Sequence, residues 1–82
     1  MQDLSQDAYN VSFGKALRRF RENRALSQET LAAQSKLDRT YISLLERNLR
    51  QPTLRTMTRL AQALGITFSE FAGAIEEGVH DH

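Results

Sequence analysis

Apolar residues recur along the chain at the spacing of amphipathic helices. The first such set follows the 3.6-residue helical period and consists of Phe13, Ala16, Leu17 and Phe20. Ser12 precedes this set in the position of an N-cap, so we expect the first helix to run from there to about Asn23. The chain has no alternating apolar run between turn residues that would indicate a strand. The pattern therefore predicts an all-α fold.

Two short helices follow with almost no chain between them. Ser27 is placed to cap a helix over 28–35, and Asp38 is placed to cap a helix from Arg39 to about Asn48. Only Lys36 and Leu37 separate the second helix from the cap of the third. Helices joined by so short a turn cross steeply, which is the arrangement of a helix-turn-helix.

Two further helices complete a predicted bundle of five. Thr53, directly after Pro52, caps a fourth helix that Gly65 ends. Thr67 and Glu70 form a capping box for a fifth helix, which we expect to end at Gly78. The start of the first predicted helix and the end of the fifth predict a flexible N-terminal tail over 1–10, one folded domain over 11–78 and a C-terminal tail over 79–82.

Basic residues are confined to the middle of the 82-residue chain. The net charge is only +1, yet all 11 Lys and Arg lie between Lys15 and Arg59, together with 4 acidic residues, which leaves this span with a charge of +7. The flanks hold the other 6 acidic residues and no Lys or Arg. A basic surface of this strength suits a polyanion such as DNA, although it could also be an ordinary solvated face.

The third helix has a polar face opposite its apolar one. Ile42 and Leu45 point to one side, and the opposite side carries Arg39, Thr40, Ser43 and Leu44. Arg39 in the first turn could pair with guanine, while Thr40 and Ser43 could reach a base or a phosphate. Leu44 could meet a thymine methyl group, or it could be one of the scattered leucines found on any surface. We expect these four residues to read bases.

Residues on both sides of this helix could hold the DNA backbone. Gln28, in the first turn of the second helix, could bind a phosphate together with free backbone N–H groups. Arg47, Asn48 and Arg50 follow the reading face and could contact the backbone on the other side.

Neither catalysis nor cofactor binding is indicated. His80 and His82 lie in a short acidic tail without a third ligand, so we predict no metal site. The chain has no Cys and no Gly-rich phosphate loop. We expect a protein that is not an enzyme, needs no cofactor and binds no small molecule. Because the chain shows neither a signal peptide nor an apolar run of membrane-spanning length, we also expect it to be cytoplasmic and free of membrane contact.

Four stretches of the chain carry a family resemblance: LRRFR over 17–21, LSQETLA over 26–32, LDRTYISLLERN over 37–48 and PTLRTMTRLAQALGI over 52–66. Together they resemble the helix-turn-helix family of phage Cro and repressor proteins from about Phe13 to Phe71. The run over 35–48 is most similar to the controller proteins of restriction–modification systems. The resemblance implies a five-helix bundle of the phage repressor type in a bacterial or phage protein.

The resemblance also implies roles for individual residues. It assigns base reading to Arg39, Thr40, Ser43 and Leu44, phosphate binding to Gln28, and backbone contacts to a further set comprising Tyr41, Arg47, Asn48 and Arg50. An ion pair between Arg21 and Glu46 should tie the first helix to the third. Lys36 and Ala25 stand where the family often has glycine, and each is strained if its φ is positive.

The resemblance and the small size of the domain both favour a homodimer. The fourth and fifth helices carry more apolar residues than one small core needs, although all of them could be core. We expect the contact between copies to include Ile66, Phe68, Phe71 and Ile75. The predicted function is a sequence-specific transcriptional regulator on a palindromic double-stranded DNA operator, with RNA polymerase as a further partner if the operator position brings the two together. An antitoxin, another protein-binding module and a purely structural bundle are the alternatives.

Overall fold

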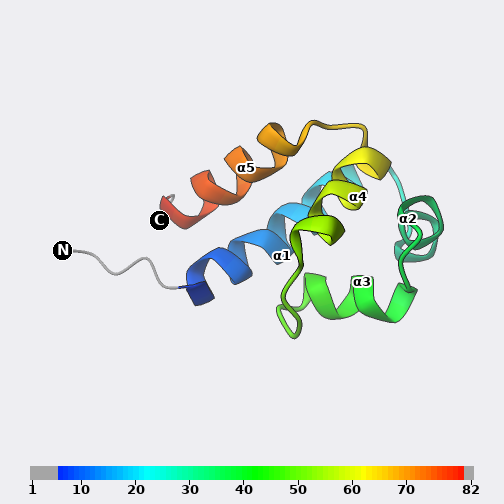
Figure 1. The fold of residues 1–82 in the computed structure, drawn as a ribbon, viewed down its shortest axis with the longest axis horizontal. Helices are drawn as coiled ribbons and strands as arrows, with labels where there is room; N and C mark the ends of the chain where they lie inside the picture. The colour runs from blue at the N-terminus through cyan, green and yellow to red at the C-terminus, as the bar shows by residue number, and fades with distance from the viewer. Residues whose placement is uncertain (1–5, 81–82) are drawn as a thin grey trace.

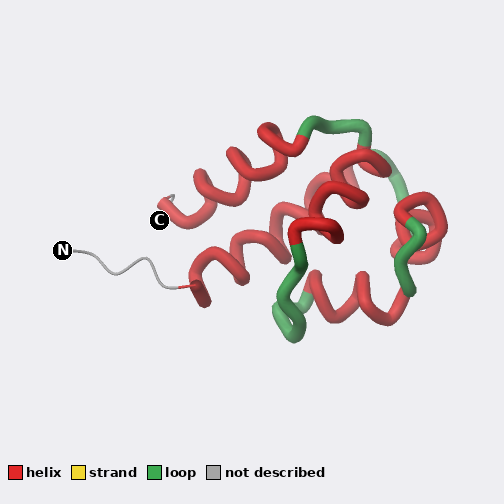
Figure 2. The backbone as a smooth tube through the Cα atoms, viewed as in Figure 1, coloured by secondary structure: helices red, strands yellow, loops and turns green. Residues whose placement is uncertain are grey.

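The computed structural model describes residues 6–80 and contains five helices (Figures 1 and 2). They are α1 (Gln6–Asn23), α2 (Gln28–Ser35), α3 (Arg39–Glu46), α4 (Leu54–Leu64) and α5 (Phe68–His80). No strand occurs within these residues. The prediction of an all-α, five-helix bundle is therefore confirmed.

The outer helices extend beyond the ends predicted for them. Helix α1 begins at Gln6, so Ser12 is not its N-cap and residues 6–10 are not a flexible tail. Ser12 is buried, and its hydroxyl donates to the carbonyl oxygen of Ile75 at 2.6 Å. The early turns form because α5 packs against them, a tertiary contact that local patterning does not reveal. Residues 1–5 of the predicted tail lie outside the described part.

Helix α5 continues past Gly78 for the same reason. Its last turn buries Val79, which the prediction placed in a C-terminal tail. A Cβ on Gly78 would overlap the hydroxyl of Ser12, so this glycine serves a close approach between two helices rather than a helix end. Residues 81 and 82 lie outside the described part.

The core lies where all five helices meet. Phe71 is fully buried at its centre, 5.5 Å from the ring of Phe13 and 5.9 Å, edge-on, from the ring of Phe20. Leucine and isoleucine side chains with no exposed surface fill the rest, namely Leu17, Leu31, Ile42, Leu45 and Leu60. Each of these helices therefore contributes its apolar face to a single cluster.

A glycine on α1 brings the end of α3 close. A Cβ on Gly14 would lie 2.8 Å from the carbonyl oxygen of Glu46 and 2.9 Å from that of Leu45. Only glycine allows the two backbones to approach this closely. The contact holds the C-terminal end of α3 against α1.

The helices divide the molecule into two ends. Helices α1 and α5 lie antiparallel and side by side at the end that holds the start of α1 and the end of α5, while α2 and α3 occupy the opposite end (Figure 1). The long axis measures 42 Å against 22 and 21 Å for the others. Helices α2 and α3 are thus displayed away from the termini. None of the described helices is long and apolar enough to cross a membrane.

Candidate nucleic-acid interface

Helices α2 and α3 form the predicted helix-turn-helix. The hydroxyl of Ser27 accepts from the backbone N–H of Thr30 at 3.0 Å, and Asp38 accepts from that of Thr40 at 2.9 Å. Both N-caps were predicted from the sequence. Lys36 between them has a φ of 60°, and the backbone N–H of Leu37 donates to the carbonyl oxygen of Ala32 at 2.9 Å. These local bonds fix the direction in which α3 leaves the turn.

Each of helices α1 to α4 ends in the same backbone arrangement, in which a left-handed residue is followed by an apolar one. The four pairs are Ala25–Leu26, Lys36–Leu37, Asn48–Leu49 and Gly65–Ile66. Only Gly65 avoids the strain of a left-handed side chain. Ala25 and Lys36 stand where the resembled family often has glycine, and both have positive φ. For Asn48 the sequence indicated a contact with the DNA backbone, but not a left-handed conformation.

The face of α3 that points away from the core carries the predicted reading residues. Ile42 and Leu45 on the opposite face have no exposed surface. Arg39 and Thr40 are exposed, and within residues 6–80 the Arg39 side chain makes no hydrogen bond or ion pair. Ser43 and Leu44 are half-buried. The first turn of α3 therefore presents a free guanidinium group and a hydroxyl to a partner.

Leu49 adds an apolar side chain that the sequence analysis did not single out. It is 58% exposed, unlike Leu26, Leu37 and Ile66 at the corresponding ends of other helices, which are half-buried and pack against the core. Its backbone N–H donates to the carbonyl oxygen of Leu44 at 2.8 Å. Leu49 therefore adds exposed apolar surface just after the C-terminal end of the reading face.

The ion pair expected between Arg21 and Glu46 is present, and Gln28 also forms a hydrogen bond with Glu46. Arg21 Nε lies 2.6 Å from Glu46 Oε2, and its Nη2 lies 3.0 Å from Oε1. Gln28 Nε2 also donates to Oε1, at 3.0 Å. The hydrogen bonds that Arg21 donates to Glu46 raise the pKa of Arg21 above its ordinary value, against the opposing effect of burial. The sequence did not predict that Gln28 would join this pair.

Besides Gln28, two of the residues assigned to the DNA backbone also have structural roles. Tyr41 is half-buried, and its hydroxyl lies 3.3 Å from that of Thr56 on α4. Asn48 is the left-handed residue that ends α3. Arg47 and Arg50 are exposed, and Arg47 Nε donates to the carbonyl oxygen of Ser43 at 3.4 Å.

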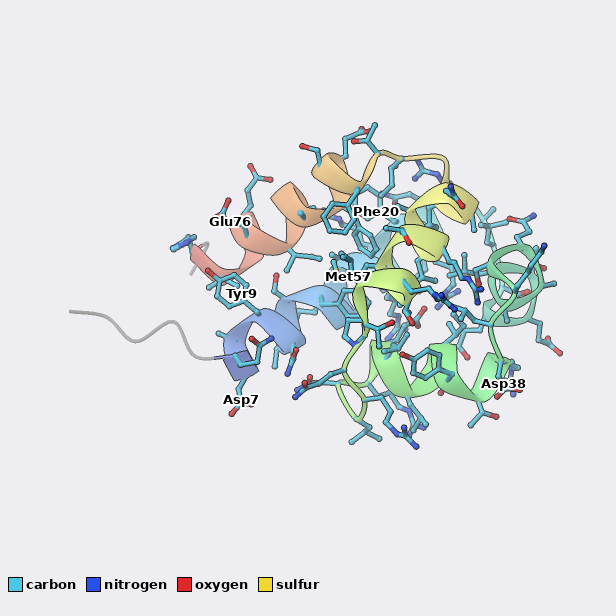
Figure 3. All side chains as sticks on the ribbon, viewed as in Figure 1. Asp7, Tyr9, Phe20, Asp38, Met57 and Glu76 are labelled. Atoms are coloured by element: carbon cyan, nitrogen blue, oxygen red, sulfur yellow. The ribbon has the colours of Figure 1, made fainter. Side chains whose placement is uncertain are left out.

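Charge is distributed unevenly over the molecule. Within the described residues, only Arg21 and Arg18 of the basic side chains form ion pairs, Arg18 with Glu22 at 3.1 Å on the surface. Exposed and unpaired basic residues run from the turn through α3 to the start of α4, namely Lys36, Arg39, Arg47, Arg50 and Arg55. Asp7 and Glu76 lie near the termini, at the other end of the molecule from Asp38 (Figure 3). The end that holds α3 is the one suited to a polyanion.

The structure divides the residues predicted to join two copies. Phe71 and Ile75 are buried in the core of their own chain, with 0% and 7% of their surface exposed, and Ile75 also lines the groove that Phe68 borders. Phe68 is 40% exposed and Ile66 is half-buried. Phe68 borders an open groove of about 810 Å³, whose walls include Tyr9, Met57, Ala72 and Gly73. Figure 3 shows Tyr9 and Met57 on the inner sides of α1 and α4.

Among residues 6–80, no three His, Asp or Glu side chains converge as metal ligands. His80 is exposed at the end of α5, and His82 lies outside the described part.

Comparison with known proteins shows which family the chain resembles in sequence and in structure. The helix-turn-helix family model matches residues 17–71, which is most of the chain. Control protein C.MunI from Mycoplasma sp is 41% identical over 68 residues, covering 82% of this chain and 92% of its own. The crystal structure of the restriction–modification controller protein C.AhdI from Aeromonas hydrophila is 46% identical, with a TM-score of 0.72, and covers 74% of this chain and 92% of its own.

A third relative was solved as a nucleoprotein complex. This protein, C.Esp1396I, is 28% identical, has a TM-score of 0.84 and covers 90% of this chain and 96% of its own. These relatives are similar to the chain over nearly all its helices, and they are regulators rather than enzymes. The chain belongs to the helix-turn-helix family of DNA-binding transcriptional regulators.

Proposed function

We propose that the protein is a sequence-specific regulator that places α3 in the major groove of double-stranded DNA. The observation that carries this proposal is the free side chain of Arg39 in the first turn of α3, held by the Asp38 cap and the Lys36 turn. In helix-turn-helix proteins the N-terminal residues of the second helix contact base edges. A relative solved as a nucleoprotein complex supports binding to nucleic acid.

Each predicted residue has a proposed task in such a complex. Arg39 would donate to O6 and N7 of a guanine, and Thr40 and Ser43 would bond to neighbouring bases or phosphates. Leu44 would contact a thymine methyl group, with Leu49 beside it. Phosphate contacts would come from Gln28 and Tyr41 on one side, and from Arg47, Asn48 and Arg50 on the other.

We further propose that two copies act together on a palindromic operator. Helix α3 has 8 residues and is only about 12 Å long, so one copy contacts few base pairs. Two copies related by a two-fold axis would read half-sites about 34 Å apart. Phe68, with Ile66 and the groove beside α5, is the exposed apolar surface proposed to join them.

The relatives support a controller type of regulator. We place it in the bacterial cytoplasm because its proposed partner is double-stranded DNA. Binding would repress transcription where the operator covers a promoter. It would activate transcription where the bound protein can touch RNA polymerase. The position of the operator therefore decides the direction of control.

Selection of bound fragments from random duplex DNA tests the proposal. We expect the purified protein to enrich a roughly palindromic sequence, and its affinity to fall steeply as salt rises. Failure to bind any duplex at low salt would refute DNA binding. Binding without enrichment of any sequence would refute sequence-specific reading.

A further inference from the structure

We propose that Glu46 positions Gln28 for its contact with DNA, in addition to joining α1 to α3. The inference rests on the proposed function, because it concerns how a residue of α2 meets a phosphate. It assigns a role in binding to a carboxylate that would by itself repel DNA.

The carboxylate of Glu46 lies where three helices meet. It is the last residue of α3, and only 4% of its side chain is exposed. Its two oxygens accept from Arg21 on α1 and from Gln28 on α2. Arg21 is held in turn by the carbonyl oxygen of Leu26, which lies 2.8 Å from its Nη1. One side chain thus connects the first three helices.

The chemistry of these groups determines which way the Gln28 amide points. An ionised carboxylate can only accept hydrogen bonds, so the nitrogen of the Gln28 carboxamide must face Glu46. One of the two N–H bonds on that nitrogen is used at Glu46, and the second has no partner among residues 6–80. A phosphate oxygen is also only an acceptor, so it needs that remaining N–H. Glu46 therefore fixes both the place and the orientation of the donor.

Arg21 makes this arrangement compatible with a nearby phosphate. Its guanidinium bonds to both carboxylate oxygens, which neutralises the charge of Glu46 at the point where Gln28 is held. An ion pair that served only to join α1 and α3 would not require Gln28. The bond from Gln28 is the feature that extends the pair toward the DNA-facing end of α2.

A double-mutant cycle tests whether Glu46 acts through Gln28. Fluorescence anisotropy with the selected duplex would compare the wild-type protein with Gln28→Ala, Glu46→Gln and the double variant. Loss of one oriented hydrogen bond should weaken binding about fivefold for Glu46→Gln alone. When Gln28→Ala is already present, adding Glu46→Gln should change the affinity by less than about twofold, because the group being positioned is absent.

Glu29→Gln is the control for charge. Glu29 is exposed in the same turn as Gln28, so its substitution removes a carboxylate without releasing the amide. It should leave affinity unchanged or raise it, equally with and without Gln28→Ala. An equal loss for Glu46→Gln in both backgrounds would show that Glu46 acts only through the fold and would overturn the inference.

A second measurement does not depend on how well the variants fold. In the ¹⁵N-labelled wild-type protein, the two side-chain amide protons of Gln28 should have distinct NMR shifts, one moved by the bond to Glu46. Adding the duplex should shift the other proton and leave the first in place. Movement of the first proton to the position of an ordinary Gln amide would show that Gln28 leaves Glu46 on binding, which contradicts the inference. A wild-type protein that binds no duplex would instead refute the proposed function itself.

Discussion

Three side chains occupy left-handed backbone positions that glycine would adopt without strain. Ala25, Lys36 and Asn48 have φ values of 54°, 60° and 61°. A left-handed residue with a Cβ costs about 1–2 kcal/mol, and Asn bears this better than most. Lys36 and Asn48 enclose α3, so two of the three strained residues set the position of the reading helix.

Ala25→Gly should stabilise the protein by about 0.5 kcal/mol. The gain is the relief of left-handed strain, reduced by the roughly 0.5–1 kcal/mol that glycine loses in chain entropy. Ala33→Gly is the matched control because Ala33 is exposed within α2, where the same change should cost about 1 kcal/mol. Urea unfolding measures both, and equal destabilisation by the two changes would contradict the strain at Ala25.

At the scale of elements, the spacing between α1 and α3 depends on one glycine. Gly14→Ala should destabilise the protein by about 1–3 kcal/mol, because the new methyl group meets the backbone carbonyls of Leu45 and Glu46. Gly73→Ala on α5 meets nothing within 4 Å and should stabilise by up to about 1 kcal/mol through helix propensity. The denaturant concentration at the unfolding midpoint would distinguish the two variants. We expect it to fall for Gly14→Ala and to rise for Gly73→Ala.

The N-terminus of α5 should make stability depend on pH. Thr67 and Glu70 form the predicted capping box, with both bonds at 2.9 Å. The backbone N–H of Thr67, and then its side chain, hold the pKa of Glu70 below its ordinary value. A lowered pKa stabilises the fold above the ordinary Glu value, and this contribution is lost as pH falls through the folded-state pKa.

Glu70→Gln keeps an acceptor at this cap but removes the titration. The melting temperature of the wild-type protein should exceed that of the variant at pH 7, and the difference should shrink as pH is lowered to about 3. A difference that stays constant across this range would show that ionised Glu70 does not contribute in this way.

The elements also show what could be predicted from the sequence. The caps at Ser27, Asp38, Thr53 and Thr67 act within one helical turn, and all four appear as predicted. The predicted start of α1 and the predicted end of α5 differ from the structure, because contacts between distant residues, such as Ser12 with Ile75, determine both ends. Phe71, which the sequence offered for a contact between copies, is fully buried in the core of its own chain by contacts of the same long-range kind. Helical periodicity shows which residues lie on the apolar face of a helix, but it does not show whether that face packs inside its own chain or against another copy.

At the scale of the whole molecule, exposed basic residues and exposed apolar surface lie in different places. Five exposed basic residues without an ion pair within residues 6–80 lie between the turn before α3 and the start of α4, while Phe68 begins α5 and borders a groove that α1, α4 and α5 line. The residues proposed to read bases could be selected from the sequence, because helical periodicity shows which residues share one face of α3. The partnership of Gln28 with Glu46 depends on how three helices pack, so no local pattern contained it.

Phe68→Ser should weaken self-association. We expect light scattering to give the mass of a dimer for the wild-type protein at tens of micromolar and a lower mass for the variant, because Phe68 is the exposed aromatic beside the groove. Val11→Ser is the control, since Val11 is equally exposed but lies on α1 outside that groove. A wild-type protein of monomer mass would contradict the proposed dimer.

The central claim is that α3 reads DNA sequence through its first turn, and Arg39→Ala tests it most directly. Affinities of the wild type and this variant would be measured for the selected duplex and for a random duplex at the same salt concentration. We predict that Arg39→Ala costs about 1–3 kcal/mol on the selected duplex, far less on random DNA, and relaxes preference at one base position. Equal losses on both duplexes would show that Arg39 contributes charge alone and would contradict the claim.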